Sequence, residues 1–172
     1  EIFLPTVAAL KAEGRPFHGV LYFGLMLTPD GPKVVEYNAR FGDPEAQVVL
    51  SLLDSDLMDI LQACVDGTLG QLDIRWRDEA GCIVVLASGG YPLDYKKGYP
   101  ISGLEEAGKT ATVFHAGTKL GPNGEYLTNG GRVLGVTATA PTLEEAIDAA
   151  YAAAKRISFQ DMHMRTDIGH AF

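Results

Sequence analysis

Residues 34–45 read Val-Val-Glu-Tyr-Asn-Ala-Arg-Phe-Gly-Asp-Pro-Glu and place several polar side chains between two apolar runs. Residues 34–41 alternate as a β-strand does, because successive side chains of a strand point to opposite faces of its sheet. The alternation predicts that Glu36, Asn38 and Arg40 share one face, roughly 6.5–7 Å apart along the strand. Carboxylate and amide oxygens suit Mg²⁺, which usually shares its ligands with nucleotide phosphates, and a guanidinium binds phosphate through a planar fork. The pattern predicts a magnesium–phosphate site, although the same residues would also suit the solvent face of an edge strand.

The turn that follows this strand has the composition of a helix start. Asp43 is a good N-cap, Pro44 suits the first helical position, and Glu45 complements the positive end of the helix dipole. The apolar pattern beyond the turn predicts a helix over residues 44–53. Capping alone is reason enough for Asp43, whatever else it does.

The segment before the motif predicts its partner strand. Residues 19–28 are apolar on both faces, which is typical of a central strand covered on both sides. Residues 29–32, Pro-Asp-Gly-Pro, have turn chemistry, so the two strands should form a hairpin. This pairing would fix the register of the motif strand, and a slip of one residue would turn Glu36 and Asn38 to the wrong face.

The rest of the chain predicts an α+β fold in two domains. We expect a helix over residues 2–13 and another that Ser55 caps and Gly67 ends. Residues 67–79 mix glycine with charges and lack periodicity, so we expect the domains to be residues 1–75 and 76–172. The second half contains mostly strands, predicted at residues 82–87, 111–115 and 132–139, with a hairpin turn at residues 121–124. A capping box of Thr142 and Glu145 begins an Ala-rich helix that runs to about Arg156.

Composition excludes several classes of protein. The 172 residues are 47% hydrophobic and 21% charged, which argues against disorder. The net charge of −8, with no basic run longer than a pair, gives no electrostatic case for nucleic acid or an anionic membrane. No apolar stretch reaches transmembrane length. The first residue is Glu1, not Met, from which we expect a fragment or a processed chain.

Two cysteines, Cys64 and Cys82, predict neither a disulfide framework nor a zinc site. We expect both to be core thiols in a reducing cytoplasm.

Residues 103–110, Gly-Leu-Glu-Glu-Ala-Gly-Lys-Thr, satisfy the letter pattern of a Walker A phosphate loop. That loop works only where it joins a strand to a helix whose N-terminus faces the phosphates. Here residues 110–114 have strand composition, and two glutamates would sit inside the phosphate cradle. We interpret the match as coincidental. The roles of Gly130-Gly131-Arg132 and of His115 stay open.

The whole chain resembles the phosphoribosylamine–glycine ligases, or glycinamide ribonucleotide synthetases, a branch of the ATP-grasp superfamily. Residues 34–45 are similar to the metal-binding strand and turn of ATP-grasp ligases, and the ending Arg-Phe-Gly-Asp-Pro-Glu is similar to this branch in particular. Further blocks match in order and spacing, namely residues 19–27, Ala87-Ser88-Gly89-Gly90-Tyr91-Pro92, Phe114-His115-Ala116-Gly117-Thr118, Gly130-Gly131-Arg132-Val133-Leu134 and Arg165-Thr166-Asp167-Ile168-Gly169.

The resemblance implies the second half of an ATP-grasp domain, an antiparallel sheet with helices, followed by a small β-rich C-terminal domain. It implies ATP-dependent ligation of glycine to 5-phosphoribosylamine in purine biosynthesis, through a glycyl phosphate. Glu36 and Asn38 match the family's ligands for Mg²⁺, with Mn²⁺ as a substitute. Arg40 is the expected catalytic residue, steadying the phosphoryl group or the sugar phosphate, and Arg40, Gly42 and Asp43 are expected to bind substrate.

The chain departs from the family pattern because it lacks the front half, which carries the nucleotide-holding lysines and a flexible glycine loop. We therefore expect this chain alone not to catalyse the ligation, and we expect the missing N-terminal half to be its partner. Two alternatives stay open: another ATP-grasp carboxylate–amine ligase, and a non-catalytic module that has kept the fold.

Overall fold

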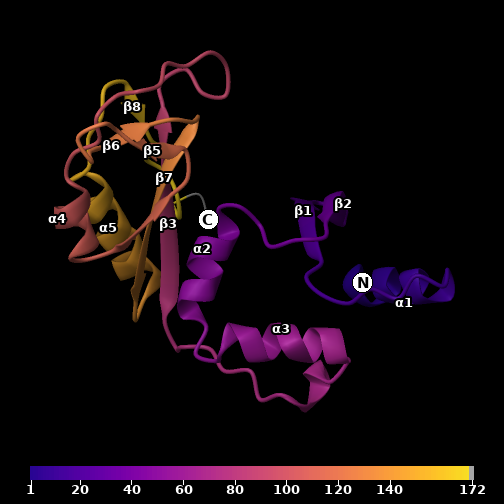
Figure 1. The fold of residues 1–172 in the computed structure, drawn as a ribbon. Coiled ribbons are helices and arrows are strands. Elements are labelled where there is room, and N and C mark those ends of the chain that lie inside the picture. The colour runs from indigo at the N-terminus through magenta and orange to yellow at the C-terminus, as the bar shows by residue number, and fades with distance from the viewer. Residues whose placement is uncertain (171–172) are drawn as a thin grey trace. The chain divides into compact units, whose positions relative to one another are not determined.

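The computed structural model describes residues 1–170 (Figure 1). These residues form two compact units. The first unit comprises residues 1–42 and 54–76, and the second comprises residues 43–53 and 77 onward. The predicted division of the family's domains after residue 75 remains a prediction.

The first unit contains two helices, a short 3-10 turn and a hairpin. The elements are α1 (Phe3–Ala12), β1 (Tyr22–Thr28), β2 (Gly31–Asn38), α3 (Leu57–Asp66) and η2 (Leu69–Gln71). Helix α1 confirms the helix predicted over residues 2–13. Helix α3 ends at Gly67, as predicted, because this residue adopts the left-handed conformation (φ 70°) that glycine enters without a Cβ penalty.

Strands β1 and β2 form the predicted antiparallel hairpin, with Thr28 opposite Gly31. The expectation that β1 is buried on both faces is wrong, since Met26 is 58% exposed and Leu27 is 80% exposed. The reason is that β1 and β2 form a two-stranded sheet within the described residues, and a hairpin cannot cover its own faces.

Aromatic side chains attach α1 to the hairpin. The ring centroids of Phe3 and Phe23 are 4.6 Å apart, and those of Phe23 and Tyr37 are 5.3 Å apart, both in edge-to-face geometry. The contact assigns Tyr37 to the face of β2 that α1 covers. By the alternation of the strand, Glu36 and Asn38 point to the other face.

The second unit is an antiparallel sheet with helices on both faces. Its helical elements are α2 (Glu45–Val49), η1 (Leu50–Leu52), α4 (Leu104–Gly108) and α5 (Leu143–Ala154). Its strands are β3 (Ala80–Ser88), β4 (Thr112–His115), β5 (Thr118–Leu120), β6 (Tyr126–Thr128), β7 (Arg132–Ala140) and β8 (Met162–His163). The main sheet has the order β4-β7-β3-β8, and β5 pairs with β6. The strands predicted in the second half are confirmed, and with them the α+β class.

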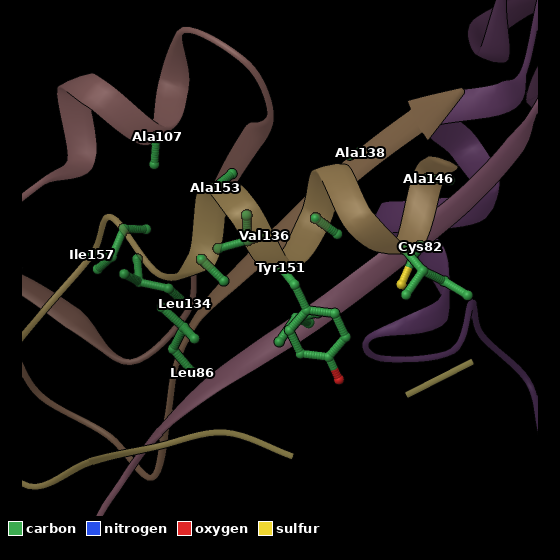
Figure 2. Packing of buried hydrophobic residues seen from close by; sticks show 14 of the residues in the cluster. Cys82, Leu86, Ala107, Leu134, Val136, Ala138, Ala146, Tyr151, Ala153 and Ile157 are labelled. Atoms are coloured by element: carbon green, nitrogen blue, oxygen red, sulfur yellow. The ribbon is translucent and has the colours of Figure 1, made fainter. Parts of the chain in front are cut away.

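The core lies between helix α5 and the sheet strands β3 and β7 (Figure 2). The alanines of α5 are small enough to bring the helix close to β3 and β7, where Leu86, Leu134 and Val136 are almost fully buried. Thr142 begins this helix as predicted, with its Oγ1 accepting a hydrogen bond from the Glu145 amide at 3.2 Å.

Helix α2 packs on the opposite face of the sheet from α5. A Cβ placed on Gly81 would lie 2.8 Å from Cγ2 of Val48, whereas the neighbouring Cys82 belongs to the core beside α5. Burial raises the pKa of the Cys82 thiol, which keeps it protonated, while Cys64 is only half-buried.

Two predicted helix caps are wrong. The side chain of Asp43 makes no capping hydrogen bond, and the N-cap position of α2 belongs to Pro44. Helix α3 is capped by Asp56, whose Oδ1 accepts from the Met58 amide at 2.7 Å. Ser55 instead accepts the amide of Arg75 at 2.8 Å, so its hydroxyl holds a loop of the first unit.

The segment after α5 is held by Tyr151, whose hydroxyl donates to the carbonyl of Arg165 and accepts the amide of Ile168. Next to it, Arg165 donates two hydrogen bonds to Asp167, at 2.9 and 2.7 Å. The hydrogen bond from Arg165 lowers the pKa of the Asp167 carboxyl, and the same bond raises the pKa of Arg165.

The Asp167 carboxyl is therefore expected to titrate below its ordinary pKa of 3.8. Because the folded-state pKa is lowered, the pair stabilises the fold above the unfolded-state pKa, and this contribution disappears as the pH falls through the folded-state value. Titration of the carboxyl carbon by NMR measures the midpoint. In Arg165→Gln the midpoint should rise towards the ordinary value, and an unchanged midpoint would contradict the assignment.

Candidate functional site

The motif strand brings the two predicted metal ligands together. Asn38 donates from Nδ2 to Oε1 of Glu36 at 3.0 Å, so the side chains lie on one face of β2. Glu36 is exposed and Asn38 is half-buried. The bond leaves Oε2 of Glu36 and Oδ1 of Asn38 as acceptors, the hard oxygen ligands that Mg²⁺ prefers. The predicted placement of these two residues is confirmed, and their role remains a prediction.

Gly24 gives Glu36 the space that its side chain occupies. The two residues are partners across the β1–β2 ladder, which shifts register directly after Gly24. A Cβ on Gly24 would lie 2.9 Å from Cγ of Glu36, closer than side-chain carbons approach one another. A larger residue at position 24 would therefore force the Glu36 side chain to move.

Arg40 does not continue the strand face. Strand β2 ends at Asn38, so the prediction of a strand through residue 41 is wrong, and Arg40 lies in the bend that follows. Its Nη1 donates to the carbonyl of Phe41 at 2.9 Å. The guanidinium is exposed and has further donors for an anion. Gly42, two residues further along the chain, is buried.

Asp43 binds an arginine far away in sequence. Within the second unit, Nη1 of Arg132 donates to the carbonyl of Asp43 and Nη2 donates to its Oδ2, both at 2.9 Å. Oδ1 of Asp43 also lies 3.4 Å from Nε2 of Gln47. This two-point contact replaces the predicted helix cap and ties the turn before α2 to the first residue of β7.

Sequence reasoning left the role of Arg132 open. The sequence feature that pointed to Arg132 was the run Gly130-Gly131-Arg132, in which a guanidinium follows two glycines. The structure explains Gly131 by close packing, since a Cβ there would overlap the ring of Tyr91. His115 is explained by local contacts, because its Nδ1 lies 3.0 Å from Oγ1 of Thr118 and its ring packs on Tyr126.

The Asp43–Arg132 pair is expected to show a measurable coupling energy. Side-chain exposures of 55% and 39% place it near the surface, where such pairs contribute about 0.2–1 kcal/mol. A double-mutant cycle of Asp43→Asn and Arg132→Gln, followed by urea unfolding, measures this term. Additive losses in the double variant would show that the contact contributes nothing to the stability of the folded chain.

The oxygens of Glu36 and Asn38 fit one hard cation whose other ligands come from water or a substrate. Among residues 1–170 no group of three or more His, Cys, Asp or Glu side chains could enclose a metal ion. Two oxygen ligands on one strand would leave most of an octahedral shell to water and to a substrate such as a nucleotide phosphate. The chemistry is suited to phosphoryl transfer more than to a structural metal site.

No helix in the described part of the chain has the length and apolar character that a membrane crossing requires.

Two family models match the chain in order. Residues 1–46 match the model of the phosphoribosylglycinamide synthetase ATP-grasp (A) domain, and residues 81–171 match that of the phosphoribosylglycinamide synthetase C domain. The first match contains both Glu36 and Asn38, and the second contains Arg132.

Curated relatives agree with these models. The chain is 48% identical to the phosphoribosylamine–glycine ligase of Caldanaerobacter subterraneus subsp. tengcongensis. The match covers all 172 residues of this chain and 41% of that protein. It is 50% identical to the ligase of Rhizobium meliloti over 98% of the chain, 40% of that protein. The chain thus spans about two fifths of the length of these relatives.

Solved structures share the fold. The phosphoribosylamine–glycine ligase of Thermotoga maritima superposes with a TM-score of 0.80 at 35% identity, over 93% of this chain and 39% of that one. N5-carboxyaminoimidazole ribonucleotide synthetase from the same organism gives a TM-score of 0.54 at 17% identity, over 91% of this chain and 41% of that one, which is a likeness of fold alone.

Proposed function

This chain belongs to the phosphoribosylglycinamide synthetase family, and from this membership we propose that it forms the C-terminal part of a ligase that joins glycine to 5-phosphoribosylamine at the expense of ATP. In this reaction the γ-phosphoryl group of ATP passes to the glycine carboxylate, giving glycyl phosphate and ADP. The amine of 5-phosphoribosylamine then displaces phosphate, which leaves glycinamide ribonucleotide as an intermediate of purine biosynthesis.

The observation that carries the proposal is the Glu36–Asn38 pair, which lies inside the matched ATP-grasp segment. These residues would hold Mg²⁺ or Mn²⁺ through their free oxygens. The metal, when bound, would neutralise phosphate charge during phosphoryl transfer. A module that had lost its activity would have no reason to keep a carboxylate and an amide together on one strand face.

The turn after β2 supplies the remaining side chains. Arg40 is proposed as the catalytic residue, because an exposed guanidinium can stabilise charge on the transferring phosphoryl group or hold the sugar phosphate. Gly42 would keep the turn open. Asp43, which Arg132 holds by two hydrogen bonds, would orient the amine substrate with its carboxylate.

The proposed partner is the rest of the enzyme, since the matched relatives are more than twice as long as this chain. We place the enzyme in the cytoplasm. The thiols of Cys64 and Cys82 are both free, which is typical of proteins kept in a reducing compartment.

A chimaeric ligase tests the proposal. In it, residues 1–172 replace the matching part of the Caldanaerobacter subterraneus relative, whose preceding part completes the enzyme. We expect ADP release that requires both glycine and 5-phosphoribosylamine, and no release from the 172-residue chain alone. Activity with another carboxylate and amine instead would favour a different ATP-grasp ligase. Glycinamide ribonucleotide formation by the isolated chain would contradict its assignment as a part.

A further inference from the structure

A polar pocket of 360 Å³ opens in the second unit beside the edge strand β4. Hydroxyl groups and one guanidinium dominate its lining, from Ser51, Arg77, Thr110, Thr112, Thr137 and Thr139. We call it the threonine pocket. No carboxylate is among its lining residues in the described chain, although the whole sequence carries a net charge of −8. Its volume lies at the lower end of the range for small-molecule sites.

Thr137, which lines this pocket, carries an unsatisfied hydroxyl. The residue is only 2% exposed, and its Oγ1 has no hydrogen-bond partner among the described residues. Its partner across the β4–β7 ladder is Thr112, whose side chain lines the same pocket. Buried hydroxyls are nearly always hydrogen-bonded, and an unpaired one is costly. A polar group that reached this hydroxyl from the pocket would satisfy it.

Arg77 supplies the charge. Its Nη2 donates to the carbonyl of Ser51, and its Nη1 lies 3.5 Å from Oε2 of Glu79. These contacts hold the guanidinium at the pocket while its remaining N–H groups stay available as donors. Arginine binds phosphate and carboxylate oxygens in preference to neutral ligands, and threonine hydroxyls add donors around such a group.

We propose that the threonine pocket binds a small oxyanion, namely a phosphate group that is free or carried by a small metabolite. The site is separate from the contact between Asp43 and Arg132. Arg132 begins β7 and Thr137 follows five residues later, about 16 Å along the strand. The proposal does not depend on the ligase activity, since none of its residues belongs to the motif of residues 34–45.

The test is a titration of the ¹⁵N-labelled 172-residue chain with inorganic phosphate, and separately with ribose 5-phosphate, at constant ionic strength set with chloride. The amides of Thr110, Thr112 and Thr137 should shift saturably. Stronger binding of ribose 5-phosphate would assign the site to a carried phosphate, and equal binding would assign it to the free ion. The absence of a saturable shift with both ligands would overturn the proposal.

Charge variants test the role of Arg77. Arg77→Gln should weaken binding by at least about tenfold, because a hydrogen bond to a charged group is lost. Glu79→Gln should strengthen it, since the competing carboxylate is removed. Phosphate affinity unchanged in both variants would overturn the proposal, because the shifts would then come from a different surface.

Thr137→Val separates a ligand role from a structural one. Valine keeps the shape and removes the hydroxyl, so phosphate binding should weaken while stability to urea stays equal or rises. The matched control is Thr128→Val, since Thr128 is fully buried and its Oγ1 accepts the amide of Tyr99 at 3.1 Å. That variant should lose stability and keep its affinity for phosphate. A loss of stability in Thr137→Val would overturn the proposal, because the hydroxyl would then have a partner in the free chain.

Discussion

In the chimaeric ligase, Glu36→Ala is expected to lower glycine-dependent ADP release by about 100-fold or more. The carboxylate is one of the two side-chain ligands proposed for the metal, and metal stabilisation of phosphoryl-transfer charge contributes several kcal/mol, at about 1.4 kcal/mol per tenfold in rate. The measurement is steady-state ADP release at several concentrations of Mg²⁺. The concentration required for half-maximal rate should rise, because the variant binds the metal more weakly.

A matched control keeps the interpretation specific. Glu13→Ala removes another exposed carboxylate from the first unit, at the end of α1, and should leave the rate unchanged. Asn38→Ala should shift the dependence on Mg²⁺ in the same direction as Glu36→Ala. If Glu36→Ala kept its rate within about twofold of the parent at every Mg²⁺ concentration, the pair would be only the solvent face of a strand.

Features that depend on neighbours in sequence could be predicted. The alternation of residues 34–38 specified the common face of Glu36 and Asn38, because strand geometry has a fixed period of two. The Thr142 cap was equally local, since a capping box needs only four residues. The resemblance to a known family then predicted the type of domain. The periodicity of the sequence could not do so, because it predicts single helices and strands.

Features that depend on distant partners could not be predicted. Asp43 was expected to cap a helix, yet its carboxylate binds Arg132, and no local rule identifies a partner 89 residues away. Strand β1 was expected to be buried because its residues are apolar on both faces. Apolar composition shows that the side chains of a strand are suited to burial. How many of them are buried depends on the strands and helices that cover the strand, and β1 pairs only with β2 among the described residues.

Gly103→Ala is expected to destabilise the second unit by about 2–4 kcal/mol, and it tests the rejection of the Walker-like run. Gly103 has φ 82°, a left-handed conformation that costs an alanine energy, and a Cβ there would overlap the backbone carbonyl of Arg156. The glycine is required because this turn packs on the end of α5. The first glycine of the Walker-like run therefore has a structural reason, and the segment that follows it, Leu104–Gly108, is itself the short helix α4.

The second glycine of the run is the matched control. Gly108 is helical, and a Cβ there meets no atom within 4 Å, so Gly108→Ala should be neutral or stabilising by up to about 1 kcal/mol. Urea unfolding measures both variants. A nucleotide-binding loop predicts a different result. Both glycines would then be needed for close approach of the phosphates, and neither substitution would change stability. Equal stability of Gly103→Ala and Gly108→Ala, with a loss of ATP binding in both, would restore the phosphate-loop interpretation.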